Sequence, residues 1–172
     1  IIFEDEKEER ERLFTPQQIT SVSAEAVLQS NPSNTADILQ KNGAVMVQMS
    51  QSGGGSPIVR GFEANRVLLV IDGVRLNNAI FRSGHLQNII STSPYMLNKM
   101  DVIFGPASVK YGSDALGGVI HIHTKSPEAH QTTKRQFAQK INTANNGFSS
   151  HFDIAWSKGK LSFLQGISVQ HY

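Results

Sequence analysis

One run of residues, DVIFGPASVKYGSDALGGVIHIHTK at positions 101–125, constrains the fold more than any other part of the chain. It predicts two apolar strands, over 101–104 and 119–124, separated by a single helical turn over 107–111. Glycine and proline stand at the boundaries, where they are expected to begin and end a helix or to form a tight bend. These boundary residues are Gly105, Pro106, Gly112, Gly117 and Gly118.

The composition narrows the class of protein without revealing its function. With 172 residues, the chain can form one or two domains with a buried core. It contains no cysteine, which excludes disulfide bridges and thiolate metal sites. It has no apolar stretch of about 18 residues, which excludes a transmembrane helix. The chain begins at Ile1 with no recognisable signal peptide, so we expect a mature or excised fragment.

The net charge of +2 hides an uneven distribution. Six of the 14 acidic residues fall within residues 4–12, so the remainder is more cationic. Two explanations stay open, a preference for an anionic ligand or surface and a merely uneven solvated surface.

Short helices and strands alternate over the first three quarters of the chain. We expect helices over 24–29 and 35–41, the first capped by Ser23 and the second by Asn34, with Gly43 ending the second. Asp72-Gly73 predicts a tight turn. This mixture of short elements predicts an α+β fold around one small mixed sheet. The expected strands cover 18–22, 44–49, 58–62, 66–71, 74–76 and 96–104.

The last part of the chain changes character after a linker. Strands are expected over 135–143, 148–157 and 161–172, joined by turns rich in asparagine, glycine and lysine. Aromatic and aliphatic residues alternate with polar ones along each strand. Antiparallel strands of about ten residues with this alternation are typical of outer-membrane barrels, although a half-buried hairpin shows the same pattern.

Two long motifs resemble the plug-domain signature of TonB-dependent outer-membrane receptors. The first is SPIVRGFEANRVLLVIDGVRLNN at residues 56–78, and the second is the run at 101–125. The resemblance implies a plug inside a 22-stranded barrel. It implies a receptor that imports a scarce nutrient, such as an iron-siderophore or haem, with no catalytic residue and no resident cofactor or metal.

Eleven residues carry this resemblance, and two positions depart from it. Phe104 stands where the family commonly has arginine, and Asn98 stands where it commonly has glutamate. Those charges usually latch the plug to the barrel wall, so Arg60 and Asp101 become candidates for other latches. The matching residues are Arg60, Gly61, Asp72, Gly73, Gly105, Pro106, Tyr111, Gly112, Asp114, Gly117 and Gly118.

The resemblance also implies a division of the chain and a set of partners. We expect a charged arm over 1–14, a plug domain over 15–125, a linker over 126–134 and the first strands of a truncated β-barrel over 135–172. The implied partners are the TonB energy-coupling protein, the chain's own C-terminal barrel and a small-molecule substrate, with no nucleic acid. The implied location is the outer membrane, with the plug inside the barrel and reached from the periplasm. The segment that contacts TonB is absent or truncated, unless Ile1-Ile2-Phe3 is its remnant.

The loop between Arg75 and His85 is the best candidate for binding a ligand. Binding residues concentrate on loops held by a rigid scaffold, and the family places ligand-facing loops at this position. Guanidinium groups would suit an anionic siderophore or a haem propionate, and His85 would suit haem iron. The candidate residues are Arg75, Asn77, Asn78, Arg82 and His85.

Other chemistry is poorly supported by the sequence. The run Gly53-Gly54-Gly55-Ser56 lacks the lysine and hydroxyl residue of a phosphate-binding loop. His121 and His123 fall on one face of a strand, but no third metal ligand lies near them in sequence. No G-x-S-x-G motif supports a hydrolase. A stand-alone periplasmic binding or signalling module built on a plug domain remains the alternative.

Overall fold

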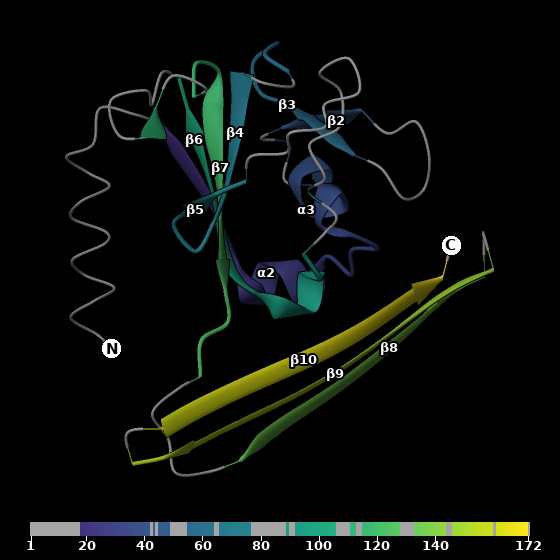
Figure 1. Ribbon diagram of the computed structural model, residues 1–172. Coiled ribbons are helices and arrows are strands. Elements are labelled where there is room, and N and C mark those ends of the chain that lie inside the picture. Colours follow the sequence, from purple (N-terminus) through teal and green to yellow (C-terminus); the bar gives the residue numbers. More distant parts are fainter. Residues whose placement is uncertain are drawn as a thin grey trace.

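The computed structural model describes residues 18–41, 43, 45–48, 55–63, 66–76, 89, 92–105, 111–112, 115–127, 133–143, 146–159 and 161–171. Short elements fill the first part of the chain and three long strands follow (Figure 1). We call the part up to Lys125 the plug and the three long strands the wall. In chain order the elements are β1 (Ile19–Ser23), α2 (Ala24–Gln29), α3 (Thr35–Lys41), β2 (Met46–Gln48), β3 (Ser56–Ile58), β4 (Val67–Ile71), β5 (Val74–Arg75), η3 (Pro94–Met96), β6 (Leu97–Phe104), β7 (Gly118–Thr124), β8 (Lys134–Asn142), β9 (Gly147–Lys158) and β10 (Leu161–His171).

The plug is built on a five-stranded sheet with the order β1-β6-β7-β4-β5. β4 and β7 run parallel, whereas the other neighbouring pairs are antiparallel, so the sheet is mixed. β2 and β3 form a separate two-stranded sheet. This arrangement confirms the predicted α+β class. None of the helices in the described ranges is long and apolar enough to cross a bilayer.

Both faces of the central sheet are covered by side chains. Alternate residues of β4, β6 and β7 fall into two separate clusters, because successive side chains of a strand point to opposite faces. The larger cluster joins the sheet to α2, α3 and β2, and includes Val27, Ile38 and Leu39. Burial on both faces explains why β4 is a continuous apolar run rather than an alternating one.

Local sequence signals set the ends of the two helices as predicted. The Ala26 N–H donates to Ser23 Oγ at 3.3 Å, which caps α2. The Asp37 N–H donates to Asn34 Oδ1 at 2.9 Å at the start of α3, and Gly43 follows its end with φ +65°.

The strand expected over 58–62 is wrong. β3 ends at Ile58, and the chain reverses through Arg60 and Gly61, whose φ angles are +50° and +82°. Val59 and Phe62 then exchange backbone hydrogen bonds of 2.9 Å across this turn. The sequence resembled a single strand because apolar residues flank the turn, with Ile58 and Val59 before it and Phe62 after it.

The turn at Asp72-Gly73 is confirmed and is tied to a distant strand. The Asp72 carboxylate accepts from the Thr124 N–H at 2.8 Å and from its hydroxyl at 2.6 Å. Both turn residues have positive φ angles. The turn between β4 and β5 is thereby fixed to the end of β7.

Asp101 lies on the β6 strand between β1 and β7 and is surrounded by polar side chains of the same sheet. Ser21 donates to Asp101 Oδ1, and Lys99 Nζ and His123 Nε2 each lie 3.2 Å from Asp101 Oδ2. Burial raises the pKa of Asp101, but the hydrogen bonds from His123 and Ser21 and the charge of Lys99 outweigh it and lower the pKa from 3.8 to about 2.

The wall is an antiparallel sheet with the order β10-β9-β8. Figure 1 shows its strands side by side as one long layer beneath the plug. Helix α2 is at the end of the plug that faces the wall. β9 pairs with β8 from Asn142↔Gly147 to Lys134↔Ala155, and with β10 from His171↔Phe148 to Leu161↔Lys158. This confirms the antiparallel strands that the sequence predicted.

Replacing Gly118 by alanine is expected to destabilise the plug more than replacing Gly73. At Gly118 a Cβ would lie 2.6 Å from the Ile103 carbonyl oxygen, a backbone atom that cannot move aside. At Gly73 the φ of +81° is strained for alanine but nothing lies within 4 Å. We expect a loss of about 1–2 kcal/mol for Gly73→Ala from backbone strain, and a larger loss for Gly118→Ala. Urea unfolding followed by circular dichroism measures both, and equal losses would contradict the close contact.

The lowered pKa of Asp101 is expected to make the plug lose stability in acid. The folded state binds this proton more weakly than the unfolded state, so the stabilisation present above pH 3.8 is lost as the pH falls toward 2. Asp101→Asn lacks this titration, so its free energy of unfolding should approach that of the wild type as the pH falls. Urea unfolding at pH values from about 5 to about 2 tests this, and a constant difference between the two proteins would contradict it.

Candidate functional site: the seat of the plug against the wall

The wall has its polar side chains inside and its apolar side chains outside. On β9 the inward residues Ser149, His151, Asp153 and Ser157 are each less than 10% exposed, at 9%, 1%, 5% and 7%. Water-soluble sheets show the opposite arrangement. The exposed outward residues of the three strands are Phe137, Ile141, Phe148, Phe152, Trp156, Leu161, Phe163, Ile167 and Val169.

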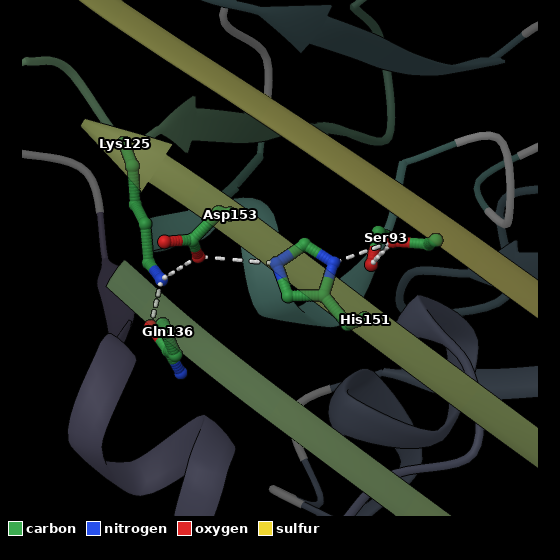
Figure 2. A network of polar contacts seen from close by, with 6 residues as sticks. Ser93, Lys125, Gln136, His151 and Asp153 are labelled. Atoms are coloured by element: carbon green, nitrogen blue, oxygen red, sulfur yellow. Dashed lines mark hydrogen bonds and ion pairs between the residues drawn. The ribbon is translucent and has the colours of Figure 1, made fainter. Parts of the chain in front are cut away.

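His151 is the centre of the contact between plug and wall (Figure 2). Its side chain is fully buried, with Nε2 3.1 Å from Asp153 Oδ2 and Nδ1 2.7 Å from Ser168 Oγ. Ser168 Oγ donates in turn to Ser93 Oγ of the plug at 2.9 Å. The Tyr95 ring of the plug stacks on the imidazole, with ring centroids 5.0 Å apart and planes at 14°. Both ring nitrogens and one ring face are therefore used.

Lys125, the last residue of the plug, supplies the charge that the buried Asp153 requires. Its Nζ donates to Gln136 Oε1 at 2.8 Å and lies 3.4 Å from Asp153 Oδ2, the same oxygen that contacts His151 (Figure 2). The Asp153 side chain is 8% exposed, and a carboxylate this buried is costly without a cation. The plug therefore supplies the positive charge that balances the Asp153 carboxylate of the wall.

A glycine of the wall allows the plug to come close. A Cβ on Gly166 of β10 would lie 2.4 Å from Met96 Sδ and 3.3 Å from His151 Cε1. The short helix η3 thus rests directly on the wall strand. We define the seat as the residues of this contact, namely Ser93, Tyr95, Met96 and Lys125 of the plug and Gln136, His151, Asp153, Gly166 and Ser168 of the wall.

A second contact joins the other end of the wall to the plug. Lys140 Nζ of β8 donates to the Asn31 carbonyl at 2.7 Å and to Ser33 Oγ at 3.2 Å. Burial lowers the pKa of Lys140, the nearby charge of Lys41 lowers it further, and Asp37 opposes them. The ammonium form is thus less favoured here than in water.

The two candidate latches, Arg60 and Asp101, make contacts within the plug. The Arg60 guanidinium lies 4.9 Å from the centroid of the Phe104 ring and bonds to Gln18. Asp101 contacts Ser21, Lys99 and His123. Phe104, the departure from the family pattern, therefore supports Arg60 through a cation–π contact.

The motif glycines fall at turns and close contacts. Gly105 and Gly112 have φ angles of +86° and +98°, and a Cβ on Gly117 would lie 2.3 Å from Phe62 Cβ. Tyr111 lies edge-on to His121 with ring centroids 6.2 Å apart. Pro106, Asp114 and the helical turn expected over 107–111 lie outside the described residues, Tyr111 excepted.

The structure describes one of the five candidate ligand-binding residues. Arg75 ends β5, and its guanidinium lies 3.1 Å from where a Cβ on Gly112 would be. Asn77, Asn78, Arg82 and His85 lie outside the described residues, so their part in binding stays a prediction. The His121 and His123 rings are tilted by 35° with centroids 3.9 Å apart, and no group of three metal-binding side chains occurs in the described part of the chain.

Sequence reasoning missed the seat. It placed His151 and Asp153 among polar strand positions but did not connect them to Lys125, Tyr95 or Ser93. The sequence held one signal of this contact. His151 and Asp153 are two ionisable residues in the middle of a strand whose apolar and polar residues alternate, and such residues require partners if they are buried.

Comparisons with known proteins agree with this architecture. Among curated relatives, the Vitamin B12 transporter BtuB of Vibrio vulnificus (strain YJ016) is 34% identical over 150 residues, covering 84% of this chain and 22% of that protein. The Hemin receptor of Yersinia pestis is 32% identical over 117 residues, covering 67% of this chain and 17% of that protein.

The fold also matches solved receptors. The pyoverdine outer membrane receptor FpvA from Pseudomonas aeruginosa PAO1 gives a TM-score of 0.72 at 18% identity, covering 91% of this chain and 22% of that one. The ferric yersiniabactin uptake receptor FyuA from Yersinia pestis gives 0.69 at 17% identity, covering 90% and 24%. The chain thus spans 17% to 24% of the length of these four proteins. The sequence matches the family described as TonB-dependent Receptor Plug Domain over residues 11–119, and the chain therefore belongs to that family.

Proposed function

We propose that this chain is the plug and the first barrel strands of an outer-membrane receptor that imports a scarce nutrient with energy delivered through TonB. The observation that carries the proposal is the inverted polarity of the wall. Polar residues of β9 are buried against the plug, while Phe148, Phe152 and Trp156 are 44%, 44% and 39% exposed. A sheet with this polarity is suited to a lipid exterior and a plugged interior.

The dimensions of the wall support the same proposal. β8, β9 and β10 contain 9, 12 and 11 residues, close to the 9–11 tilted residues that span a bilayer. The alternative, a stand-alone periplasmic module, would expose the apolar outer face to water. An apolar surface of that kind marks an interaction site rather than a free surface.

The proposed role is transport and gating, without catalysis. The plug would close the barrel, sense the substrate and contact TonB through a segment near the N-terminus. The substrate class is a metal chelate such as an iron-siderophore or haem. The names of the relatives, a vitamin B12 transporter and a hemin receptor, and the pyoverdine bound to the solved receptor support this class.

The seat would hold the plug in the closed position. Lys125 and Asp153 bring opposite charges from the two parts into a buried place, and Tyr95 and Ser93 fix η3 on the wall. Breaking a buried ion pair by removing one partner costs roughly 3–5 kcal/mol, much more than a surface pair. The seat can thus keep the barrel closed until a directed force acts on the plug.

We expect Lys125→Met to loosen the plug more than Asp153→Asn. The first change leaves a buried carboxylate without its cation, whereas the second leaves a lysine that is 25% exposed and can reach water. The double variant should be closer to the wild type than the sum of the single effects predicts. The measurement is the sensitivity of cells carrying the full-length receptor to a large hydrophilic antibiotic that the outer membrane excludes.

The matched control for this cycle is Lys158→Met. Lys158 is an exposed lysine at the end of β9, pairs with Leu161 on the outer face and lies outside the seat, so its removal should leave the barrier intact. Additive single effects, or a leak of equal size in Lys158→Met, would show that the seat does not hold the plug.

The predicted ligand loop is tested by uptake. Replacing Arg75 and Arg82 by alanine should weaken binding of an anionic substrate by tenfold or more, because a hydrogen bond to a charged group contributes about 1.5–3 kcal/mol. Replacing His85 should abolish uptake only if the substrate is haem. Radiolabelled binding and uptake by cells with the full-length variants measure both effects.

The single variants separate ligand binding from folding. Arg75 also contacts the Gly112 segment, so Arg82→Ala is the cleaner test of the ligand. Lys41→Ala, which removes a cation of the plug at the end of α3, is the control and should keep wild-type uptake. Wild-type binding in the Arg75/Arg82 double variant would place the binding site on other loops.

A further inference from the structure

Two formal charges lie on the outer face of the described wall strands, and both are positive. Side chains of paired residues point to the same face of an antiparallel sheet. Arg135 pairs with Ile154, two positions from the outward Phe152 and Trp156, and Lys158 is two positions beyond Trp156 on the same strand. Both cations are exposed. No acidic residue shares this face within β8, β9 and β10.

These cations lie at the same end of the wall. β8 begins at Lys134, β9 ends at Lys158 and β10 begins at Leu161, so Arg135 and Lys158 both belong to the end next to the linker. Lys134, the neighbour of Arg135, pairs with Ala155 and so belongs to the inner face with Gln136 and Lys140. We call Arg135 and Lys158 the basic rim.

The opposite end of the wall is different. There β8 ends at Asn142, β9 begins at Gly147 and β10 ends at His171, and the described outer face has no lysine, arginine or acid. Lys140 belongs to the inner face and donates to the Asn31 carbonyl of the plug. The asymmetry is therefore confined to the surface that faces away from the plug.

Aromatic and aliphatic side chains adjoin the basic rim. Trp156 and Phe163 face each other on the neighbouring strands with ring centroids 6.3 Å apart, and Leu161 beside Lys158 is 71% exposed. Aromatic rings at the edge of an apolar band sit at the level of lipid headgroups. Long arginine and lysine side chains can extend from that band to the headgroups while their stems remain in apolar surroundings.

We propose that the basic rim binds the headgroups of anionic phospholipids in the leaflet at the linker end of the wall. The proposal rests on the proposed function only in that the outer face of the wall lies in a bilayer. Charge complementarity selects the occupant, since two cations on a face where β8, β9 and β10 carry no acidic residue match phosphate groups, and arginine grips them bidentately. A second protein would instead be expected to bring an acidic or apolar surface to the rim.

The expected size of the effect follows from the number of cations. Each lysine or arginine near an anionic surface contributes an attraction equivalent to about a fivefold preference. The preference should be local, present at the basic rim and absent at the opposite end of the same strands. A local probe is therefore needed, because lipid binding by the whole receptor sums over all its strands.

The test uses the full-length receptor in liposomes with equal amounts of phosphatidylglycerol and phosphatidylcholine. A photo-reactive benzoylphenylalanine replaces Leu161 at the basic rim or, in a matched protein, Ile141 at the opposite end; both side chains are 71% exposed. Mass spectrometry identifies the crosslinked lipids. We expect phosphatidylglycerol to be enriched several-fold at Leu161 and not at Ile141. The double variant Arg135→Gln, Lys158→Gln should lose the enrichment, and Lys41→Gln should keep it.

Each other outcome has a distinct meaning. Equal labelling of the two lipids at Leu161 would overturn this proposal and leave the proposed receptor function in place. Crosslinks from Leu161 to protein instead of lipid would overturn it in favour of a protein interface. An absence of lipid crosslinks at both positions would overturn the membrane location of the wall and with it the proposed function.

Discussion

The buried carboxylate of Asp153 is the constraint on which the relation between plug and wall depends. A sheet that turns its aromatic side chains outward must turn its polar side chains inward, and each of these then needs a partner. Lys125 supplies the charge for Asp153, and Ser168 relays a hydrogen bond from His151 to the plug. Because Lys125 and Ser93 come from the plug, the charge of Asp153 is balanced and the hydrogen bond from Ser168 is completed only when the plug is in place.

Within the plug, the parallel pair of β4 and β7 plays the organising role. Both strands are buried on both faces, and the chain enters β7 through two glycines without room for a side chain. Gly117 lies against Phe62 and Gly118 against the Ile103 carbonyl. The turn at Asp72 then ties the far end of this pair together through Thr124. The motif residues thus keep distant strands in contact, which explains why glycine and short polar residues dominate them.

Phe104, one of the two departures from the family pattern, takes part in a contact inside the plug. Phe104 accepts the Arg60 guanidinium over its ring, so an arginine that was a candidate latch supports the plug itself. The described links to the wall pass instead through the seat and through Lys140, which donates to Asn31 and Ser33 of the plug. A buried network of this kind depends on geometry more than a surface ion pair does, since each member is held by at least one neighbour.

The sequence by itself determined the local elements and the family. Helix caps at Ser23 and Asn34, the turn at Asp72-Gly73 and the alternation of the last three strands all depend on neighbouring residues, and local rules describe such interactions well. The turn at Arg60-Gly61 was misjudged because apolar residues flank it and hide the change of direction.

Only the tertiary structure decided which face of the wall is inside and which residues form the seat. Alternation shows that two faces exist, but it does not say which of them the plug covers. Lys125, Gln136 and Asp153 are separated by 11 to 28 positions, and Ser93 and Ser168 by 75. Contacts over such separations arise from the packing of one layer on another, and no local pattern encodes them.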